Sequence, residues 1–148
     1  MKATEELLKD HKMVRKVLAD FHLSNPRFPQ LLNTLTRILK AHAWFEDVIF
    51  LPALDREPRL KRLDRQISDE HKDLTALLRE LHETPLTERP ELEFNLIQLR
   101  SILETHFKKE EDALFPLAER ILDSEGLLQM GDEMHRRRLE VRELRSTE

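Results

Sequence analysis

The 148-residue sequence contains no cysteine. This absence excludes disulfide bonds, iron–sulfur clusters and thiolate zinc sites, so any metal ion must be held by nitrogen and oxygen atoms. Glycine is almost as scarce, since only Gly126 and Gly131 occur, both in the last quarter of the chain. Phosphate-binding loops of the GxGxxG or GxxxxGK type are therefore excluded as well.

Long apolar runs and an excess of positive charge are also missing. No run of about 18 apolar residues exists, and the opening segment MKATEELLKD lacks the apolar core of a signal peptide. The 25 lysines and arginines face 29 aspartates and glutamates, which gives a net charge of −4 and argues against a dedicated nucleic-acid-binding protein. We therefore expect a cytoplasmic protein with neither a membrane nor a nucleic-acid partner.

The sequence does contain strong helical periodicity. Apolar residues recur at steps of three and four over four long segments: 4–21, 29–55, 58–81 and 87–117. A fifth, less regular segment covers 127–145, and its apolar positions include Val141 and Leu144. Thr4 is expected to cap the first helix. Pro116 lies inside the fourth segment and is expected to end or kink that helix.

Four long helices with short connections predict an all-α fold. We expect an up-down-up-down antiparallel four-helix bundle in residues 1–124, with an additional C-terminal helix in residues 125–148 appended to it.

The chain also repeats itself in two places. A first match joins DHKMVRKVLADFH (10–22) and EHKDLTALLRELH (70–82), and a second joins HAWFEDVIFLP (42–52) and HFKKEEDALFP (106–116). Two helical hairpins related by pseudo-symmetry, each carrying the same polar insertions, are the arrangement that these matches predict.

Four histidines occupy positions where the pattern calls for an apolar residue. A single histidine there would most simply be a core residue with its hydrogen bonds satisfied. This chain has one in each helix, at similar distances from the connecting turns. At ~1.5 Å per residue, an antiparallel bundle brings all four imidazoles to about the same level. The four are His11, His42, His71 and His106.

Two glutamates follow these histidines at helical spacing. Glu46 comes four residues after His42, and Glu110 comes four residues after His106, so each pair projects from one helix face. Burying two carboxylates without partners costs on the order of several kcal/mol each, because each charge loses its hydration. A pair of metal ions removes that cost, because the ions neutralise the carboxylates and coordinate the imidazoles.

The type of metal follows from the donor set. Four nitrogens and two carboxylates are too many ligands for one tetrahedral zinc ion and too rich in nitrogen for calcium or magnesium. Two ions, each with two histidines and sharing both carboxylates, fit the repeat, and iron is the metal that we expect. The Glu-x-x-His pairs of ferritin-like bundles and the HExxH motif of zinc proteases are both absent.

These residues resemble those of the hemerythrin-like, or HHE cation-binding, domains. The resemblance covers about residues 5–120 and is carried by DHK at 10–12, HAWFE at 42–46, EHK at 70–72 and HFKKEE at 106–111, with FLP and LFP after them. It implies an oxo- or hydroxo-bridged di-iron centre with two iron ions per chain. The implied ligands are His11, His42, Glu46, His71, His106 and Glu110.

The chain departs from the oxygen-carrying hemerythrins at one ligand. Those proteins have a fifth histidine four residues after the third-helix histidine, where this chain has Thr75. They also usually place an aspartate five residues after the fourth-helix histidine, where this chain offers Glu110 at four and Glu111 at five. The resemblance therefore points away from reversible oxygen storage and toward proteins of nitric oxide or peroxide stress, or of iron delivery in iron–sulfur repair.

Three functions remain open on this basis. The first is a non-haem di-iron protein that binds oxygen or nitric oxide in sensing, scavenging or stress response. The second is an enzyme that consumes peroxide or nitric oxide. The third is an iron-sensing or iron-delivery module that contacts a protein partner, or a second copy as a homodimer, through the C-terminal helix. Whether the chain is an enzyme is left open.

The remaining histidines are expected to lie away from the centre. His22 and His82 follow His11 and His71 by eleven residues, which is about 16 Å along a helix. We expect them to interact with the carboxyl ends of their helices, and we expect His135 to be exposed.

Several charged residues beside the expected ligands are open to two interpretations. Asp10, Asp47, Glu70 and Glu111 are either hydrogen-bond partners of ligands or surface groups. The basic run Arg136–Arg138 is expected to form a solvated face.

Overall fold

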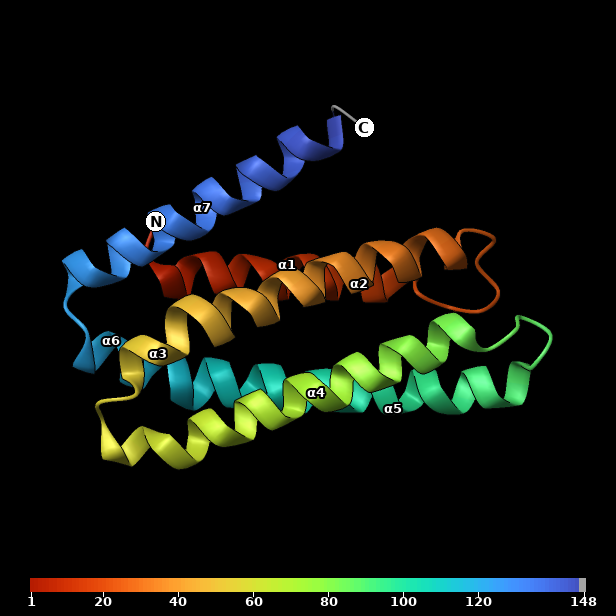
Figure 1. Cartoon of the computed structure of the whole chain (residues 1–148). Helices are drawn as coiled ribbons and strands as arrows, with labels where there is room; N and C mark the ends of the chain where they lie inside the picture. The colour runs from red at the N-terminus through yellow and green to blue at the C-terminus, as the bar shows by residue number, and fades with distance from the viewer. Residues whose placement is uncertain (147–148) are drawn as a thin grey trace.

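The computed structural model describes the backbone of residues 1–146 and the side chains of residues 1–140. The expected all-α bundle is confirmed, and no β-strand occurs in the described backbone. Figure 1 shows the hairpin of the first two long helices packed over the hairpin of the other two. The four long helices are α1 (Ala3–Asp20), α2 (Phe28–Trp44), α4 (Lys61–Glu83) and α5 (Arg89–Lys109).

The apolar core is divided into two clusters along the bundle. One lies toward the loops that join α1 to α2 and α4 to α5, and it includes Phe21, Phe28 and Leu92. The other lies at the opposite end and includes Phe50, Leu60 and other buried residues. The buried polar side chains of the expected site belong to neither cluster.

Two widened turns interrupt the helices at equivalent places. In the π-helical segment η1 (Phe45–Phe50) the N–H group of Leu51 donates to the carbonyl of Glu46, and in η3 (Glu110–Leu114) the N–H group of Phe115 donates to the carbonyl of Glu110. Pro52 and Pro116 follow directly. Because proline lacks an N–H group and crowds the carbonyl four residues back, a π turn accommodates it.

The kink expected at Pro116 is therefore a wide turn, and the helix continues beyond it. Short helices carry the chain onward: α3 (Leu51–Leu54), the 3₁₀ helix η2 (Pro58–Leu60) and α6 (Phe115–Ile121).

The additional C-terminal helix, α7 (Ser124–Ser146), packs along α1 and diverges from the bundle toward its own end (Figure 1). Leu127 and Met134 are buried against the bundle. At Gly131 a β-carbon would collide with the backbone carbonyl of Met1, so glycine permits this close crossing. The expected apolar positions Val141 and Leu144 lie outside the residues whose side chains are described.

No helix within the described part of the chain has the length and apolar character needed to cross a membrane.

One buried carboxylate in this fold lacks partners. Both oxygens of Asp64 are buried without a hydrogen bond, and burial together with the charge of Asp55 raises the pKa of Asp64 to about 6. The repeat places Thr4 at the equivalent position of α1, where its hydroxyl donates to Glu119 at 2.5 Å. Thr4 thus lies inside α1 rather than capping it, because its hydroxyl serves this tertiary contact.

We expect Asp64→Asn to stabilise the protein by on the order of 1 kcal/mol at pH 8, because the variant removes a buried unpaired charge. The folded-state pKa of Asp64 lies above the ordinary value of 3.8. The ionised carboxylate therefore destabilises the fold fully above about pH 6, and this destabilisation disappears as the pH falls from about 6 toward 3.8. The difference in free energy of unfolding between variant and parent should shrink between pH 8 and pH 4. Asp69→Asn, at an exposed position of the same helix, is the control. A difference independent of pH would contradict this account.

Candidate metal centre

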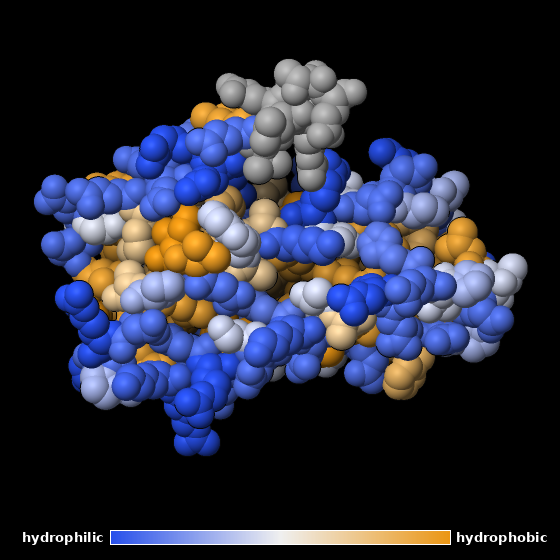
Figure 2. All heavy atoms as spheres, in the orientation of Figure 1, coloured by the Kyte–Doolittle hydropathy of each residue, from blue (hydrophilic) through white to orange (hydrophobic). Residues whose placement is uncertain are grey.

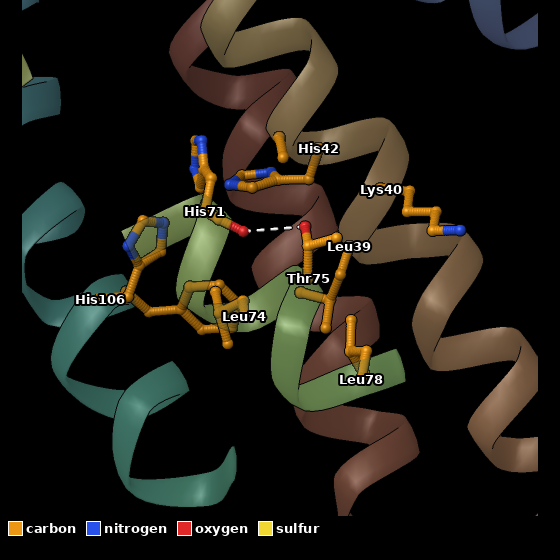
Figure 3. A pocket seen from close by; sticks show the side chains of 10 residues that line it. Leu39, Lys40, His42, His71, Leu74, Thr75, Leu78 and His106 are labelled. Carbon is orange, nitrogen blue, oxygen red and sulfur yellow. Dashed lines mark hydrogen bonds between the residues drawn. The ribbon is translucent and has the colours of Figure 1, made fainter. Parts of the chain in front are cut away.

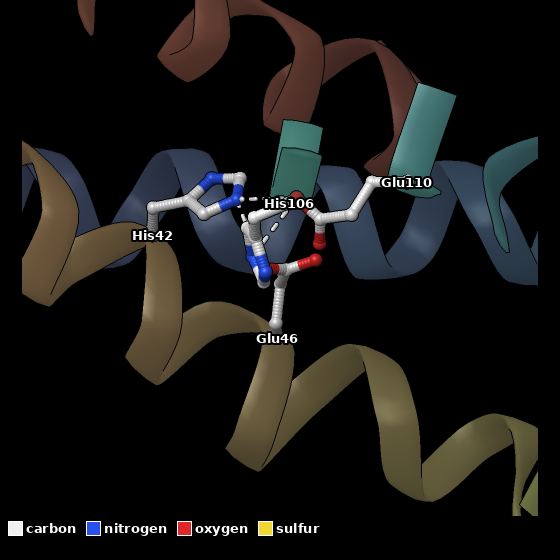
Figure 4. A group of neighbouring side chains, drawn as sticks. All are labelled: His42, Glu46, His106 and Glu110. Carbon is white, nitrogen blue, oxygen red and sulfur yellow. Dashed lines mark hydrogen bonds and ion pairs between the residues drawn. The ribbon is translucent and has the colours of Figure 1, made fainter. Parts of the chain in front are cut away.

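Six buried side chains meet at one level of the bundle, as the sequence predicted. The Nε2 atoms of His11 and His42 lie 2.9 Å from Oε1 of Glu110 and Glu46, respectively. His71 Nε2 lies 3.1 Å from Oε1 of Glu46, and His106 Nε2 lies 3.4 Å from Oε1 of Glu110. All six are buried, and the two glutamates are fully so. Two of the imidazoles and both glutamates are seen in Figure 4.

Several polar atoms at the middle of this cluster have no hydrogen-bond partner. They are Nε2 of His106 and Oε2 of both Glu46 and Glu110. Donor atoms of His42, His106 and the two glutamates lie within 4.8 Å of one another. Unpaired buried nitrogen and oxygen atoms at such distances fit a metal site with mixed imidazole and carboxylate ligands.

A second ring of carboxylates fixes the outer nitrogen of every imidazole. The hydrogen bonds from Nδ1 pair His11 with Glu111 (2.6 Å), His42 with Asp10 (2.9 Å), His71 with Asp47 (3.0 Å) and His106 with Glu70 (2.9 Å). Such bonds fix the ring orientation and make Nε2 the nitrogen that faces the interior. The four acids whose role was open in the sequence are therefore partners of the histidines, not free surface groups.

These outer carboxylates are themselves held by donors farther out. Arg15 donates to Glu111 at 2.8 Å, and Lys109 donates to Glu70 at 2.7 Å. Asp47 differs, because its outer donor among the described residues is the uncharged hydroxyl of Ser68, at 3.2 Å.

The donor to Asp10 comes from α7. Arg138 donates to both oxygens of Asp10, at 2.6 and 3.0 Å, and its guanidinium lies 4.7 Å from the centre of the Phe45 ring. The expectation of a solvated face at Arg136–Arg138 is wrong for Arg138, because the buried acid on α1 draws its side chain inward. Arg136 and Arg137 are exposed as expected.

The repeat explains why this arginine is needed. Lys109 precedes Glu110 by one residue, and the equivalent position before Glu46 is Phe45. The first half of the bundle therefore lacks the cation that the second half supplies from its own helix. Arg138 provides that cation from α7, across the ring of Phe45.

Charge in this region is balanced only with the help of the imidazoles. Six carboxylates face three basic side chains, Arg15, Lys109 and Arg138. Burial alone would lower the pKa of His42, but Glu46 and Asp10 raise it to about 10. Burial likewise opposes protonation of His71, whose pKa Asp47 and Glu46 raise to about 9.

Two other members of the cluster, His11 and Glu46, have lowered pKa values. Burial and the charge of His42 lower the pKa of His11 to about 4. Burial would raise the pKa of Glu46, but His42, His106 and His71 hold it well below its usual range. Bound metal cations would supply the positive charge beside the carboxylates, and they would bind the imidazoles in their neutral form.

A small cavity adjoins the cluster on one side. Its wall includes the imidazoles of His42, His71 and His106, together with Thr75 (Figure 3). Ala43 also lines it, and the centre of a water-sized molecule can occupy about 20 Å³ within it. The Thr75 hydroxyl donates to the carbonyl of His71 at 2.9 Å, so it is occupied by the helix backbone. The cavity has space for about one molecule of that size.

The other three histidines lie outside the cluster, as expected. His22 is exposed and approaches the carbonyl of Ala19 at 3.2 Å, near the end of α1. His82 does not bond to the end of its own helix as expected, because its ring forms a hydrogen bond with the hydroxyl of Thr36 on α2, at 2.8 Å. His135 is exposed, as expected.

We expect Arg138→Met to lower the free energy of unfolding by about 3 kcal/mol, because it leaves the buried carboxylate of Asp10 without its cation. Arg136→Met removes the same charge from an exposed position of the same helix and should change stability by less than about 0.5 kcal/mol. Urea unfolding followed by circular dichroism measures both. Equal effects of the two variants would show that the contact of Arg138 with Asp10 contributes nothing to stability.

Comparison with known proteins agrees with this geometry. The family model described as hemerythrin HHE cation binding domain matches residues 2–118 and also residues 62–146. The fold is similar to the crystal structure of a hemerythrin HHE cation binding domain-containing protein from Mycobacterium kansasii, with a TM-score of 0.78, 23% identity, and coverage of 93% of this chain and 85% of that one. A comparison with curated proteins gives no match. The chain belongs to the hemerythrin HHE cation-binding family.

Proposed function

We propose that this chain is a non-haem di-iron protein that binds a small molecule at its metal centre. The observation that carries the proposal is the set of buried, unpaired atoms on His106, Glu46 and Glu110, surrounded by imidazoles whose outer nitrogens are already fixed. The ligands would be His11, His42, Glu46, His71, His106 and Glu110.

The imidazoles fall into two pairs, which supports one ion for each pair. The rings of His11 and His42 lie 4.9 Å apart, and those of His71 and His106 lie 5.0 Å apart. Oε1 of Glu110 approaches Nε2 of His11 and of His106, which belong to different pairs. The glutamates therefore suit a bridging role between two ions.

Iron held by these residues would supply a place for a small ligand and electrons for its reduction. The chain's own residues restrict what can reach it, because the adjoining cavity has space for about one water-sized molecule. Oxygen, nitric oxide and peroxide meet that restriction. Sensing or scavenging such a molecule in oxidative or nitrosative stress is the function that this geometry supports best.

Turnover of peroxide or nitric oxide is the second candidate, and Thr75 is the observation that favours it. Its hydroxyl is bonded to the backbone, so the residue adds no ligand to those of His71 and His106. Two imidazoles and two carboxylates would not supply enough donor atoms to saturate an iron ion, which would suit reaction better than stable storage.

The proposal is tested by metal analysis of protein expressed with supplemented iron. We expect two iron ions per chain, and we expect Glu46→Ala or Glu110→Ala to weaken iron binding by at least about tenfold, because each carboxylate serves both ions. His22→Ala is the control and should leave the iron content unchanged. One zinc ion per chain, or no metal after iron supplementation, would refute the proposal.

Thr75→His should slow oxidation of the reduced, iron-loaded protein by air. The new imidazole would fill an open position and occupy the adjoining cavity, whereas the parent should oxidise rapidly and without reversal. Stopped-flow absorption after mixing with oxygenated buffer measures the rate, and Thr75→Val controls for loss of the hydroxyl. If the parent takes up and releases oxygen repeatedly without oxidation, a carrier or oxygen-sensing role replaces the stress-response assignment.

A further inference from the structure

The proposed ligand His42 is connected to α7 through one buried carboxylate. Oδ2 of Asp10 accepts from Nδ1 of His42 at 2.9 Å and from Arg138 at 3.0 Å, while Oδ1 of Asp10 accepts from Arg138 at 2.6 Å. The guanidinium thus binds both oxygens of a carboxylate that is only 1% exposed. Because both oxygens are held, the oxygen that faces His42 is fixed in position.

Among the outer carboxylates, this one differs in where its donor comes from. The donors to Glu111 and Glu70 belong to α1 and α5, and the donor to Asp47 is Ser68 of α4. These three helices are part of the four-helix bundle. Among the described residues, Asp10 alone takes its cation from the appended helix α7.

Arg138 also contacts two other groups of the bundle. Its Nε atom lies 3.4 Å from Oε2 of Glu6, a second buried acid on α1. Its guanidinium lies 4.7 Å from the centre of the ring of Phe45, the residue that precedes the proposed ligand Glu46. The side chain therefore joins α7 both to the helix of Asp10 and to the widened turn that carries Glu46.

Little else holds this end of α7 against the bundle. Met134 is buried, but of residues 135–140 only Arg138 is not exposed, and Arg137 makes a looser contact, 5.7 Å from the centre of the Trp44 ring. A groove opens here between α7, α1 and α2, in which the centre of a water-sized molecule can occupy about 770 Å³. The described part of α7 is also mostly hydrophilic on the face seen in Figure 2. The docked position of this segment therefore depends on Arg138.

We infer that Arg138 is a positioning residue for the ligand His42, so that docking of α7 and binding of iron strengthen each other. The inference rests on the proposed di-iron function and adds that α7 takes part in metal binding. Groups that fix the outer nitrogen of a metal-ligating imidazole contribute about tenfold to a hundredfold to metal affinity. Since coupling between two sites is reciprocal, iron stabilises docked α7 by the same factor by which docked α7 strengthens iron binding.

The first test measures the affinity of the folded protein for ferrous iron, by anaerobic competition with a chelator. We expect Arg138→Met to weaken iron binding by about tenfold, and Arg138→Lys, which keeps a cation beside Asp10, to recover part of that loss. Arg136→Met removes the same charge from an exposed position of α7 and should bind iron as the parent does. Leu92→Ala, which lowers stability in the apolar cluster near the connecting loops, should also leave iron affinity unchanged.

A double-mutant cycle separates positioning from a general effect of losing a helix contact. Asp10→Asn keeps the shape of the side chain and removes the charge that Arg138 holds. If Arg138 acts through Asp10, Arg138→Met should weaken iron binding much less in the Asp10→Asn background than in the parent. Losses that simply add would overturn the inference.

The reverse direction is measured on α7 itself, by hydrogen exchange with mass spectrometry. Iron loading should slow amide exchange in residues 132–140 more in the parent than in Arg138→Met, by about the factor that Arg138 contributes to iron affinity. Equal slowing in the two proteins would contradict the coupling.

Failure of this inference differs from failure of the proposed function. Iron absent from the parent would refute the di-iron function and the inference with it. Two iron ions in the parent, with the same iron affinity in Arg138→Met, would refute the inference and leave the metal site intact. If Arg138→Met does not fold, Arg138→Gln, which keeps a hydrogen-bond donor without the charge, replaces it: weaker iron binding supports the inference, and unchanged binding refutes it.

Discussion

The burial of two carboxylates, Glu46 and Glu110, is the constraint on which the rest of this structure depends. They lie fully buried between two apolar clusters, where an uncompensated charge would be costly. Basic and acidic groups alternate outward from these two glutamates. Imidazoles surround the glutamates, and outer carboxylates form hydrogen bonds with the imidazoles. Arginine or lysine side chains pair with three of those outer carboxylates. The polar layer therefore extends from the middle of the bundle to its surface. Because its members come from different helices, the helices must pack so that these pairs can form.

The widened turns η1 and η3 are part of this placement. Glu46 and Asp47 are consecutive, yet they contact the two nitrogens of one ring, that of His71, at 3.1 and 3.0 Å. Glu110 and Glu111 contact the two nitrogens of His11 in the same way, at 2.9 and 2.6 Å. Consecutive residues of a regular α-helix project about 100° apart, so this double contact coincides with a turn that is wider than α. The prolines after each turn belong to the same local arrangement.

The sequence was sufficient for features that follow from helical spacing and from the repeat. The bundle, the common level of the four histidines and the inward direction of Glu46 and Glu110 all depend on positions along single helices. Features that depend on how separate helices pack could not be predicted from the sequence. Arg138 looked like one member of a basic run because nothing local to α7 indicates the buried Asp10 on α1. Thr4 looked like a helix cap because its partner, Glu119, lies 115 residues away.

The departures from the repeat matter as much as the repeat itself. A strictly two-fold centre would offer the same surroundings on both sides. Three differences break that equivalence: Phe107 against Ala43, Arg15 against Thr75, and Lys109 against Phe45. The last is compensated by Arg138 from α7, which restores a cation beside Asp10. The first two are not compensated, and the cavity lies where they occur. The duplicated hairpins thus account for the set of donor atoms, whereas the substitutions between them account for the position of the cavity beside that set.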